Sequence, residues 1–251
     1  TPARAWIRPS CLLSQFKRLS IGGAAVDPTR SPLIHNPRTL NELSLLFQRI
    51  EDPILWAGGT YLMSQKEYYP STSNRHIIDL GSIEELKRIS RTDRYLEIGA
   101  MVTASSLLSG GKLVLPTILK EALGSLISQI TRRQITIGGS VCEPASRLAF
   151  SIALSVLDAQ AELRQWEDGR FSATWVPVNR LYNKDGSLIS RSSPYVLTKI
   201  RIGLEWGDFQ RFVRIDNAIR DPETAVLVAF QATQTQTTIA HARFSASFPK
   251  R

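Results

Sequence analysis

The spacing of apolar residues alternates along the chain between the period of a helix and that of a strand. Between residues 40 and 50, Leu40, Leu43 and Phe47 recur at three- and four-residue intervals, which predicts an amphipathic helix. Thr39 precedes the first of them and is a suitable N-cap. Residues 54–57 then form a short apolar run that predicts a buried strand leading directly into a Gly-Gly pair.

The same pattern continues to the end of the chain. Further helical stretches are expected at residues 61–65, 83–86, 103–108, 116–127 and 147–156. Further strands are expected at residues 76–80, 95–100, 159–166, 175–178, 195–202, 209–215 and 237–248. Residues 224–232 fit a helix or a strand equally well, and Asp168-Gly169 is typical of a hairpin turn. This mixture predicts an α+β protein.

Two Gly-Gly pairs carry the clearest chemical signal. We call residues 57–60 the first glycine segment and residues 136–140 the second glycine segment. In each, an apolar residue precedes the pair and a hydroxyl side chain follows it. Consecutive N–H groups in a tight glycine turn can form a concave nest for an anion. Two nests suggest one diphosphate held from both sides, and the alternative is two ordinary tight turns.

Composition narrows the chemistry without identifying it. The 251 residues carry a net charge of +9, but the basic residues are scattered and do not alternate with aromatic ones, so we expect no nucleic-acid groove. No apolar run is long enough for a membrane span. Only Cys11 and Cys142 are present, and the three histidines lack ligand spacing, so we expect neither a disulfide framework nor a metal site. Redox chemistry would therefore need an organic cofactor or a metal held by a partner. The low cysteine content is typical of a reducing compartment, so we expect a cytoplasmic protein.

Five sequence blocks together resemble a known family. They are residues 54–60 (ILWAGGT), 77–86 (IIDLGSIEEL), 96–103 (LEIGAMVT), 136–142 (TIGGSVC) and 153–159 (ALSVLDA). Their order and spacing are similar to those of the FAD-binding medium subunit of molybdenum hydroxylases, the family of carbon monoxide and xanthine dehydrogenases. The resemblance extends over residues 32–248.

The resemblance implies a fold and a division into domains. An N-terminal extension, residues 1–31, would precede an FAD-binding domain of two α+β subdomains at residues 32–178. A small C-terminal domain with a three-stranded antiparallel sheet would occupy residues 179–251 and be shorter than in the family. The implied function is electron transfer from an iron–sulfur small subunit through FAD to NAD or another acceptor. A large molybdopterin subunit would carry the primary substrate, and no side chain of this chain would be catalytic.

The resemblance also implies the residues that contact FAD. They are Ala57, Gly58, Gly59, Thr60, Tyr61, Arg132, Thr136, Ile137, Gly138, Gly139, Ser140 and Arg211. The chain departs from the family where Arg133 replaces an asparagine and Ala149 an aspartate, and Tyr61 stands where an acidic residue is frequent. These departures motivate an alternative, a structural subunit with weak or absent FAD binding. A different flavoenzyme with a related FAD domain, such as a p-cresol-methylhydroxylase-like oxidase, is a third hypothesis.

Overall fold

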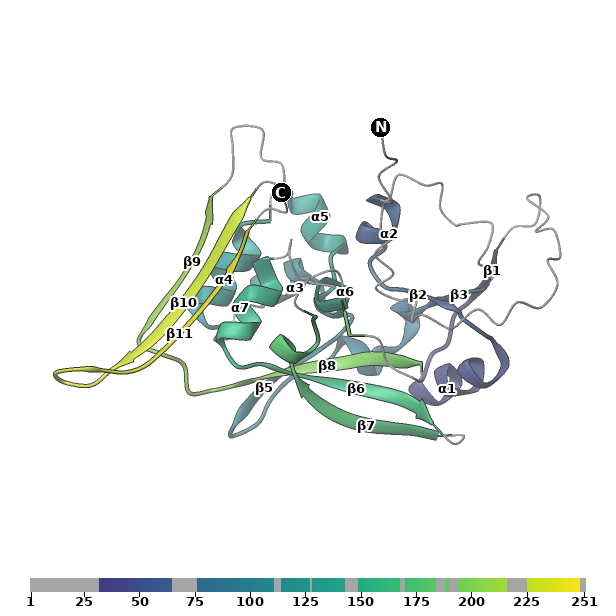
Figure 1. Ribbon diagram of the computed structural model, residues 1–251. Coiled ribbons are helices and arrows are strands. Elements are labelled where there is room, and N and C mark those ends of the chain that lie inside the picture. Colours follow the sequence, from purple (N-terminus) through teal and green to yellow (C-terminus); the bar gives the residue numbers. More distant parts are fainter. Residues whose placement is uncertain are drawn as a thin grey trace, which may run out of the picture.

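Three β-sheets and a group of short helices build the protein (Figure 1). The computed structural model describes residues 32–64, 76–110, 114–126, 128–142, 149–167, 170–183, 188–189, 194–215 and 225–248. The expected extension at residues 1–31 and the expected turn at Asp168-Gly169 lie outside these ranges. Within them, no helix combines the length and apolar character that crossing a membrane requires.

The first sheet is parallel, with strands in the order β1-β3-β2. Its strands are β1 (Leu33–His35), β2 (Ile54–Trp56) and β3 (His76–Asp79). Helix α1 (Leu40–Arg49) buries its predicted apolar face against them, and the Thr39 hydroxyl accepts the Glu42 N–H at 3.1 Å, which confirms the N-cap. Short helices follow the sheet strands: α2 (Thr60–Ser64), η1 (Leu80–Ser82) and η2 (Glu84–Lys87).

The second sheet is antiparallel and has five strands in the order β4-β5-β8-β6-β7. Its strands are β4 (Ile89–Arg91), β5 (Tyr95–Gly99), β6 (Gln160–Glu167), β7 (Arg170–Pro177) and β8 (Tyr195–Gly203). One face packs under helices (Figure 1), where residues such as Ile98, Leu154 and Ile200 form the main core. The helices are α3 (Ala104–Ser109), α4 (Thr117–Gly124), α5 (Gln129–Gln134), α6 (Ile137–Cys142) and α7 (Ala149–Val156), and η4 (Val178–Arg180) follows β7.

The position of strand β8 conflicts with a domain boundary at residue 178. It lies between β5 and β6, hydrogen-bonded to both, although it follows residue 178 in sequence. A boundary at residue 178 would separate this central strand from its own sheet.

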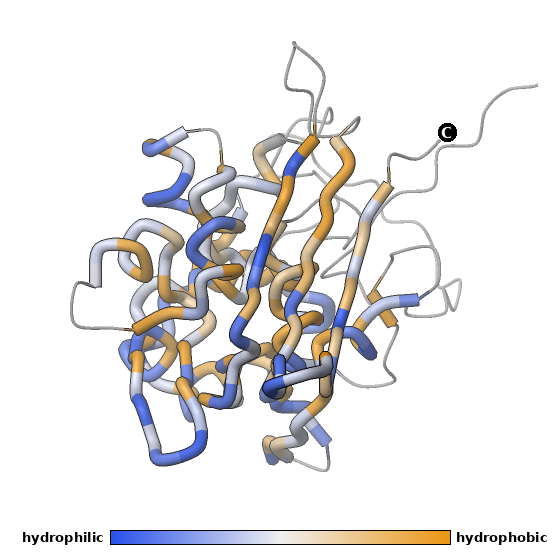
Figure 2. The backbone as a smooth tube through the Cα atoms, turned by 90° about the vertical axis from the view of Figure 1, so that its left-hand side faces the viewer, coloured by the Kyte–Doolittle hydropathy of each residue, from blue (hydrophilic) through white to orange (hydrophobic). Residues whose placement is uncertain are grey.

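The third sheet is the expected three-stranded antiparallel sheet, in the order β11-β10-β9. Its strands are β9 (Phe209–Ile215), β10 (Val226–Gln234) and β11 (Ile239–Ser247). Leu227 and Ala229 of β10 point toward the core, so from Val226 onward the ambiguous stretch is a strand with one buried face. Figure 2 views this sheet from outside, where apolar and polar residues are mixed along its three strands.

A candidate cofactor site at the two glycine segments

The fold brings the two glycine segments into direct contact. An added Cβ at Gly58 would stand 3.5 Å from the Thr136 nitrogen of the second segment and only 1.8 Å from the carbonyl oxygen of Gln134, two residues before it. An added Cβ at Gly139 would lie 3.9 Å from the Cβ of Ala57. The segments are far apart in sequence, yet they form one junction between the first sheet and the helices over the second.

The first glycine segment forms a tight turn between β2 and α2. Gly59 has a φ of +69°, and an added Cβ would lie 2.4 Å from the Trp56 ring, so only glycine fits without strain. The Gly59 carbonyl accepts the Met63 N–H at 2.9 Å, which begins α2. Among the described residues, none accepts a hydrogen bond from the N–H of Gly58, Gly59 or Thr60. These donors are suited to an anionic ligand.

The second glycine segment differs from the expected nest because it begins the short helix α6. Its N–H groups already donate within the chain: Ile137 to the Val102 carbonyl, Gly138 to the Ala100 carbonyl, and Gly139 and Ser140 to the Thr136 hydroxyl and carbonyl. Internal hydrogen bonds thus occupy the N–H groups of residues 137–140 that we expected to hold a diphosphate.

Packing explains the second pair of glycines. An added Cβ at Gly138 would lie 2.6 Å from the Cβ of Ala100, so glycine allows α6 to approach the end of β5. Ile137 is completely buried and packs in the main core. Thr136 is the member of this segment that faces the junction, and its hydroxyl can still donate its hydrogen.

A pocket of about 410 Å³ lies at the junction. Gly58, Gly81, Thr103, Ser106, Gln134 and Thr136 supply backbone and polar groups, Ile89, Met101 and Val102 supply apolar surface, and Lys87 and Arg133 supply positive charge. The Lys87 amine also pairs with the exposed Glu84 carboxylate at 2.7 Å. Apolar walls with two cations suit a ligand that joins an aromatic ring to phosphate.

The expected site residues separate into three groups. Gly58 and Thr136 line the pocket, and Ala57, Gly59, Thr60 and the half-buried Tyr61 belong to the same turn or to α2. Ile137, Gly138, Gly139 and Ser140 form α6 directly behind it.

The two expected arginines have different surroundings. Arg132 lies on α5 beside the junction, and its Nε is buried without a hydrogen-bond partner among the described residues. Arg211 lies on β9, far from α2 at the other end of the molecule (Figure 1), and pairs with Glu121 of α4 at 2.8 Å. Arg211 is therefore not part of the pocket.

The structure also locates Arg133 and Ala149, the two residues that replace family residues near the second glycine segment. Arg133 lines the pocket, so the substitution of asparagine adds a cation at the site. Ala149 is buried in α7 as part of the main core.

Sequence reasoning did not single out Lys87, Thr103 or Ser106, although they line the pocket. Thr103 ends one of the five family-like blocks and Lys87 follows another. Position in or beside these blocks was therefore the sequence signal that could have identified Thr103 and Lys87 as pocket residues.

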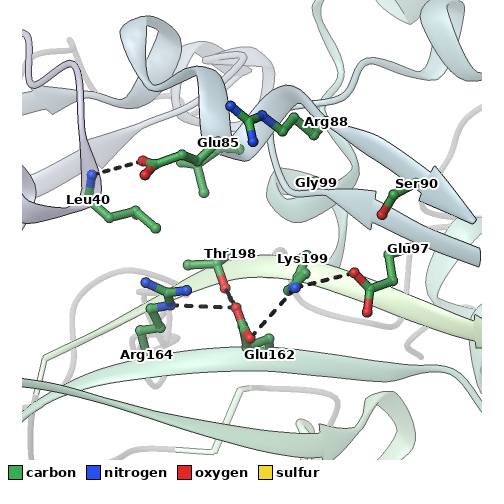
Figure 3. A pocket seen from close by; sticks show the side chains of 11 residues that line it. Leu40, Glu85, Arg88, Ser90, Glu97, Gly99, Glu162, Arg164, Thr198 and Lys199 are labelled. Carbon is green, nitrogen blue, oxygen red and sulfur yellow. Dashed lines mark hydrogen bonds and ion pairs between the residues drawn. The ribbon is translucent and has the colours of Figure 1, made fainter. Parts of the chain in front are cut away.

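A second cavity, of about 250 Å³, lies between η2 and the five-stranded sheet (Figure 3). Its buried carboxylate, Glu162, accepts the Thr198 hydroxyl and lies 3.5 Å from Arg164 Nε and 4.0 Å from Lys199 Nζ. Lys199 also pairs with Glu97 at 3.2 Å. These charges compensate one another, so we interpret the cavity as a structural junction.

Cys142 ends α6. Burial raises the pKa of its thiol to about 12, because the thiolate would lose hydration. The thiol stays protonated at neutral pH, as expected for an inert packing cysteine.

Comparison with known proteins gives the fold a family context. Residues 27–203 match the model of the FAD binding domain in molybdopterin dehydrogenase. No curated protein matches the sequence at a significant level.

Solved structures share the fold. A chain of carbon monoxide dehydrogenase from Hydrogenophaga pseudoflava superposes with a TM-score of 0.74 at 21% identity, over 87% of this chain and 75% of the other. The enzyme from Oligotropha carboxidovorans gives 0.74 at 23%, over 88% and 76%. Quinoline 2-oxidoreductase from Pseudomonas putida 86 gives 0.69 at 20%, over 86% and 74%.

Proposed function

The chain belongs to the family of FAD-binding domains in molybdopterin dehydrogenases, and on that premise we propose that it is the electron-transfer subunit of such a dehydrogenase. FAD would bind at the junction of the two glycine segments. Electrons would arrive from an iron–sulfur small subunit and leave to NAD or another acceptor. A large molybdopterin subunit would complete this complex in the cytoplasm.

The contact between Gly58 and the second glycine segment is the observation that carries this proposal. An added Cβ at Gly58 would collide with the Gln134 carbonyl, so the close approach requires glycine. The same junction supplies backbone donors from the first segment, the Thr136 hydroxyl, and the cations Lys87 and Arg133. These groups fit the diphosphate of FAD, and the apolar surface of Met101 and Ile89 fits one of its rings.

The residues of this chain bind and orient the cofactor. Bound FAD supplies the redox chemistry itself. We propose that N–H groups of Gly58, Gly59 and Thr60 donate to phosphate oxygens, while Arg133 and Lys87 balance their charge. The pocket is smaller than a whole dinucleotide, so it would hold only part of FAD.

We propose a revised domain boundary after Gly203. Strand β8 ends there and belongs to the five-stranded sheet, whereas β9 begins the third sheet. The FAD-binding domain would then include residues 32–203. Limited proteolysis that leaves a stable fragment ending near residue 178, without β8, would contradict this division.

Flavin binding tests the proposal directly. The purified chain is incubated with FAD, passed through a desalting column and examined by visible absorption. We expect flavin bands to elute with the protein, and to remain absent after incubation with riboflavin, which lacks phosphate. Elution without flavin in both cases would contradict FAD binding.

One observation favours a second candidate, a structural subunit with weak FAD binding. The N–H groups of residues 137–140 already donate within the chain, so fewer backbone donors remain for a diphosphate. A reconstituted complex that keeps full activity without flavin on this chain would support that candidate.

A further inference from the structure

Two histidines lie together at the edge of the first sheet, away from the proposed cofactor pocket. Strands β1 and β3 pair in parallel with Leu33 opposite His76 and His35 opposite Ile78, so the histidines are diagonal neighbours. His35 Nε2 and His76 Nδ1 are 3.0 Å apart, and the rings stack with centroids 5.3 Å apart.

This separation suits two ligands of one metal ion. Zinc lies about 2.0–2.1 Å from each imidazole nitrogen. Two such nitrogens are about 2.9 Å apart at a right angle and about 3.3 Å apart at the tetrahedral angle. The observed 3.0 Å falls between these values, so the two nitrogens are close enough to share one ion once each ring turns away from their hydrogen bond and toward that ion.

Both histidines can offer a ring nitrogen to a metal that arrives from solvent. A neutral imidazole has the lone pair that a metal requires. Both rings are half-buried, which leaves access from solvent.

The absence of oxygen and sulfur ligands narrows the choice of ion. Among the described residues, no third histidine, cysteine, aspartate or glutamate joins the pair to make a larger cluster. Zn²⁺, Ni²⁺ and Cu²⁺ bind well to imidazole nitrogen, whereas Mg²⁺ and Ca²⁺ prefer oxygen ligands. Water would complete the coordination.

We propose that His35 and His76 form a two-histidine site for Zn²⁺, Ni²⁺ or Cu²⁺ that fastens β1 to β3. Strand β1 has only three residues, and its Leu33 and Ile34 side chains are exposed, so little packing holds it. A metal shared with β3 would hold this edge strand in register. The site is separate from FAD binding and needs no redox step.

Equilibrium dialysis of the full chain without a polyhistidine tag, against Zn²⁺ and then Ni²⁺, tests the site. We expect about one bound ion, with affinity reduced at least about tenfold in His35→Ala and in His76→Ala. His241→Ala is the matched control, because His241 is an exposed histidine on β11, and its affinity should not change.

A second measurement keeps the test decisive. His35→Gln and His76→Gln keep a polar side chain, and circular dichroism with the FAD-binding assay reports whether each variant folds. The proposal is supported if Zn²⁺ raises the Tm of the wild type and not of the folded variants. If the wild type binds no ion, or the variants bind it equally, the histidines form a hydrogen bond only and the proposal is wrong.

Discussion

At the scale of single residues, Gly58 decides whether two distant segments can meet. Its missing side chain leaves room for the Gln134 carbonyl, and no small rotation of a neighbouring side chain could accommodate a methyl group there. Gly203, in contrast, has no atom within 4 Å of an added Cβ. The two glycines therefore form a matched pair for testing the junction.

We predict that Gly58→Ala weakens FAD binding at least about tenfold, or about 1.4 kcal/mol. The added methyl group forces the first glycine segment away from the second and disrupts the pocket between them. Gly203→Ala should bind FAD like the wild type. Fluorescence titration of FAD measures both, and equal affinities would contradict the proposed role of the junction.

Arg133 is the residue whose role the structure changes most. The sequence comparison presents it as a departure from the family asparagine, whereas its position in the pocket wall makes it a source of positive charge. Because the side chain is exposed, salt should screen its interaction with phosphate.

We predict that Arg133→Asn lowers FAD affinity about fivefold at low salt, and that the difference shrinks at high salt. Arg170→Asn is a suitable control, since Arg170 is an exposed arginine at the start of β7 and does not line the pocket. Titrations at two salt concentrations give the comparison. A loss that is independent of salt would indicate a structural effect instead.

Cys142 gives a prediction that depends on pH. Its thiol pKa is raised to about 12 in the folded state, so the thiol remains protonated at pH 9, where an unfolded cysteine begins to ionise. The resulting contribution to stability is full below pH 9 and is lost as pH rises toward 12.

We predict slow alkylation of Cys142 by iodoacetamide in the folded protein at pH 8, and rapid alkylation after unfolding. Cys11→Ser removes the other cysteine and isolates the signal, which mass spectrometry can follow. Equal rates in the two states would show that the thiol is accessible.

At the scale of helices and strands, periodicity predicted the longer elements because each buries one face. Helix α1 and strands β5, β6 and β8 follow the expected apolar spacing. The short elements β1, β4 and α5 were not predicted, because they have few or no buried residues to set a period. Two further stretches escaped this reasoning for other physical reasons. Residues 224–232 are apolar on most positions, so the period was ambiguous, and the Gly138-Gly139 pair forms part of a helix because tertiary hydrogen bonds to Ala100 and Val102 hold its start.

Glu162 tests how the central strands are held together. Its carboxylate is about nine-tenths buried and interacts with Thr198 and Lys199 of β8 and Arg164 of β6. Glu84 also forms an ion pair, with Lys87, but is mostly exposed.

We predict that Glu162→Ala lowers the free energy of unfolding by about 2 kcal/mol, because it leaves partly buried cations without their partner. Glu84→Ala should change it by less than about 0.5 kcal/mol, as is usual for an exposed pair. Urea denaturation measures both values. Similar losses in the two variants would show that the buried ion pairs of Glu162 contribute no more to the free energy of unfolding than the exposed pair of Glu84.

At the scale of the whole molecule, the fold explains why only part of the site was predictable. Glycine composition identified both segments, but only the packing of the first sheet against the helices revealed that Gly58 contacts Gln134 and Thr136. Lys87 was hidden because its neighbours suggested only a helical turn. Arg211 matched the family pattern by position, yet the third sheet carries it away from the pocket.

Hydrogen exchange with and without FAD tests the central claim, that one FAD site lies at the glycine junction, most directly. The account predicts that FAD slows exchange at the amides of Gly58, Gly59 and Thr60. It predicts no change at residues 137–140, whose N–H groups already donate within the chain, or in β9–β11. Protection confined to the third sheet or to the Glu162 cavity, or no protection at all with saturating FAD, would contradict it.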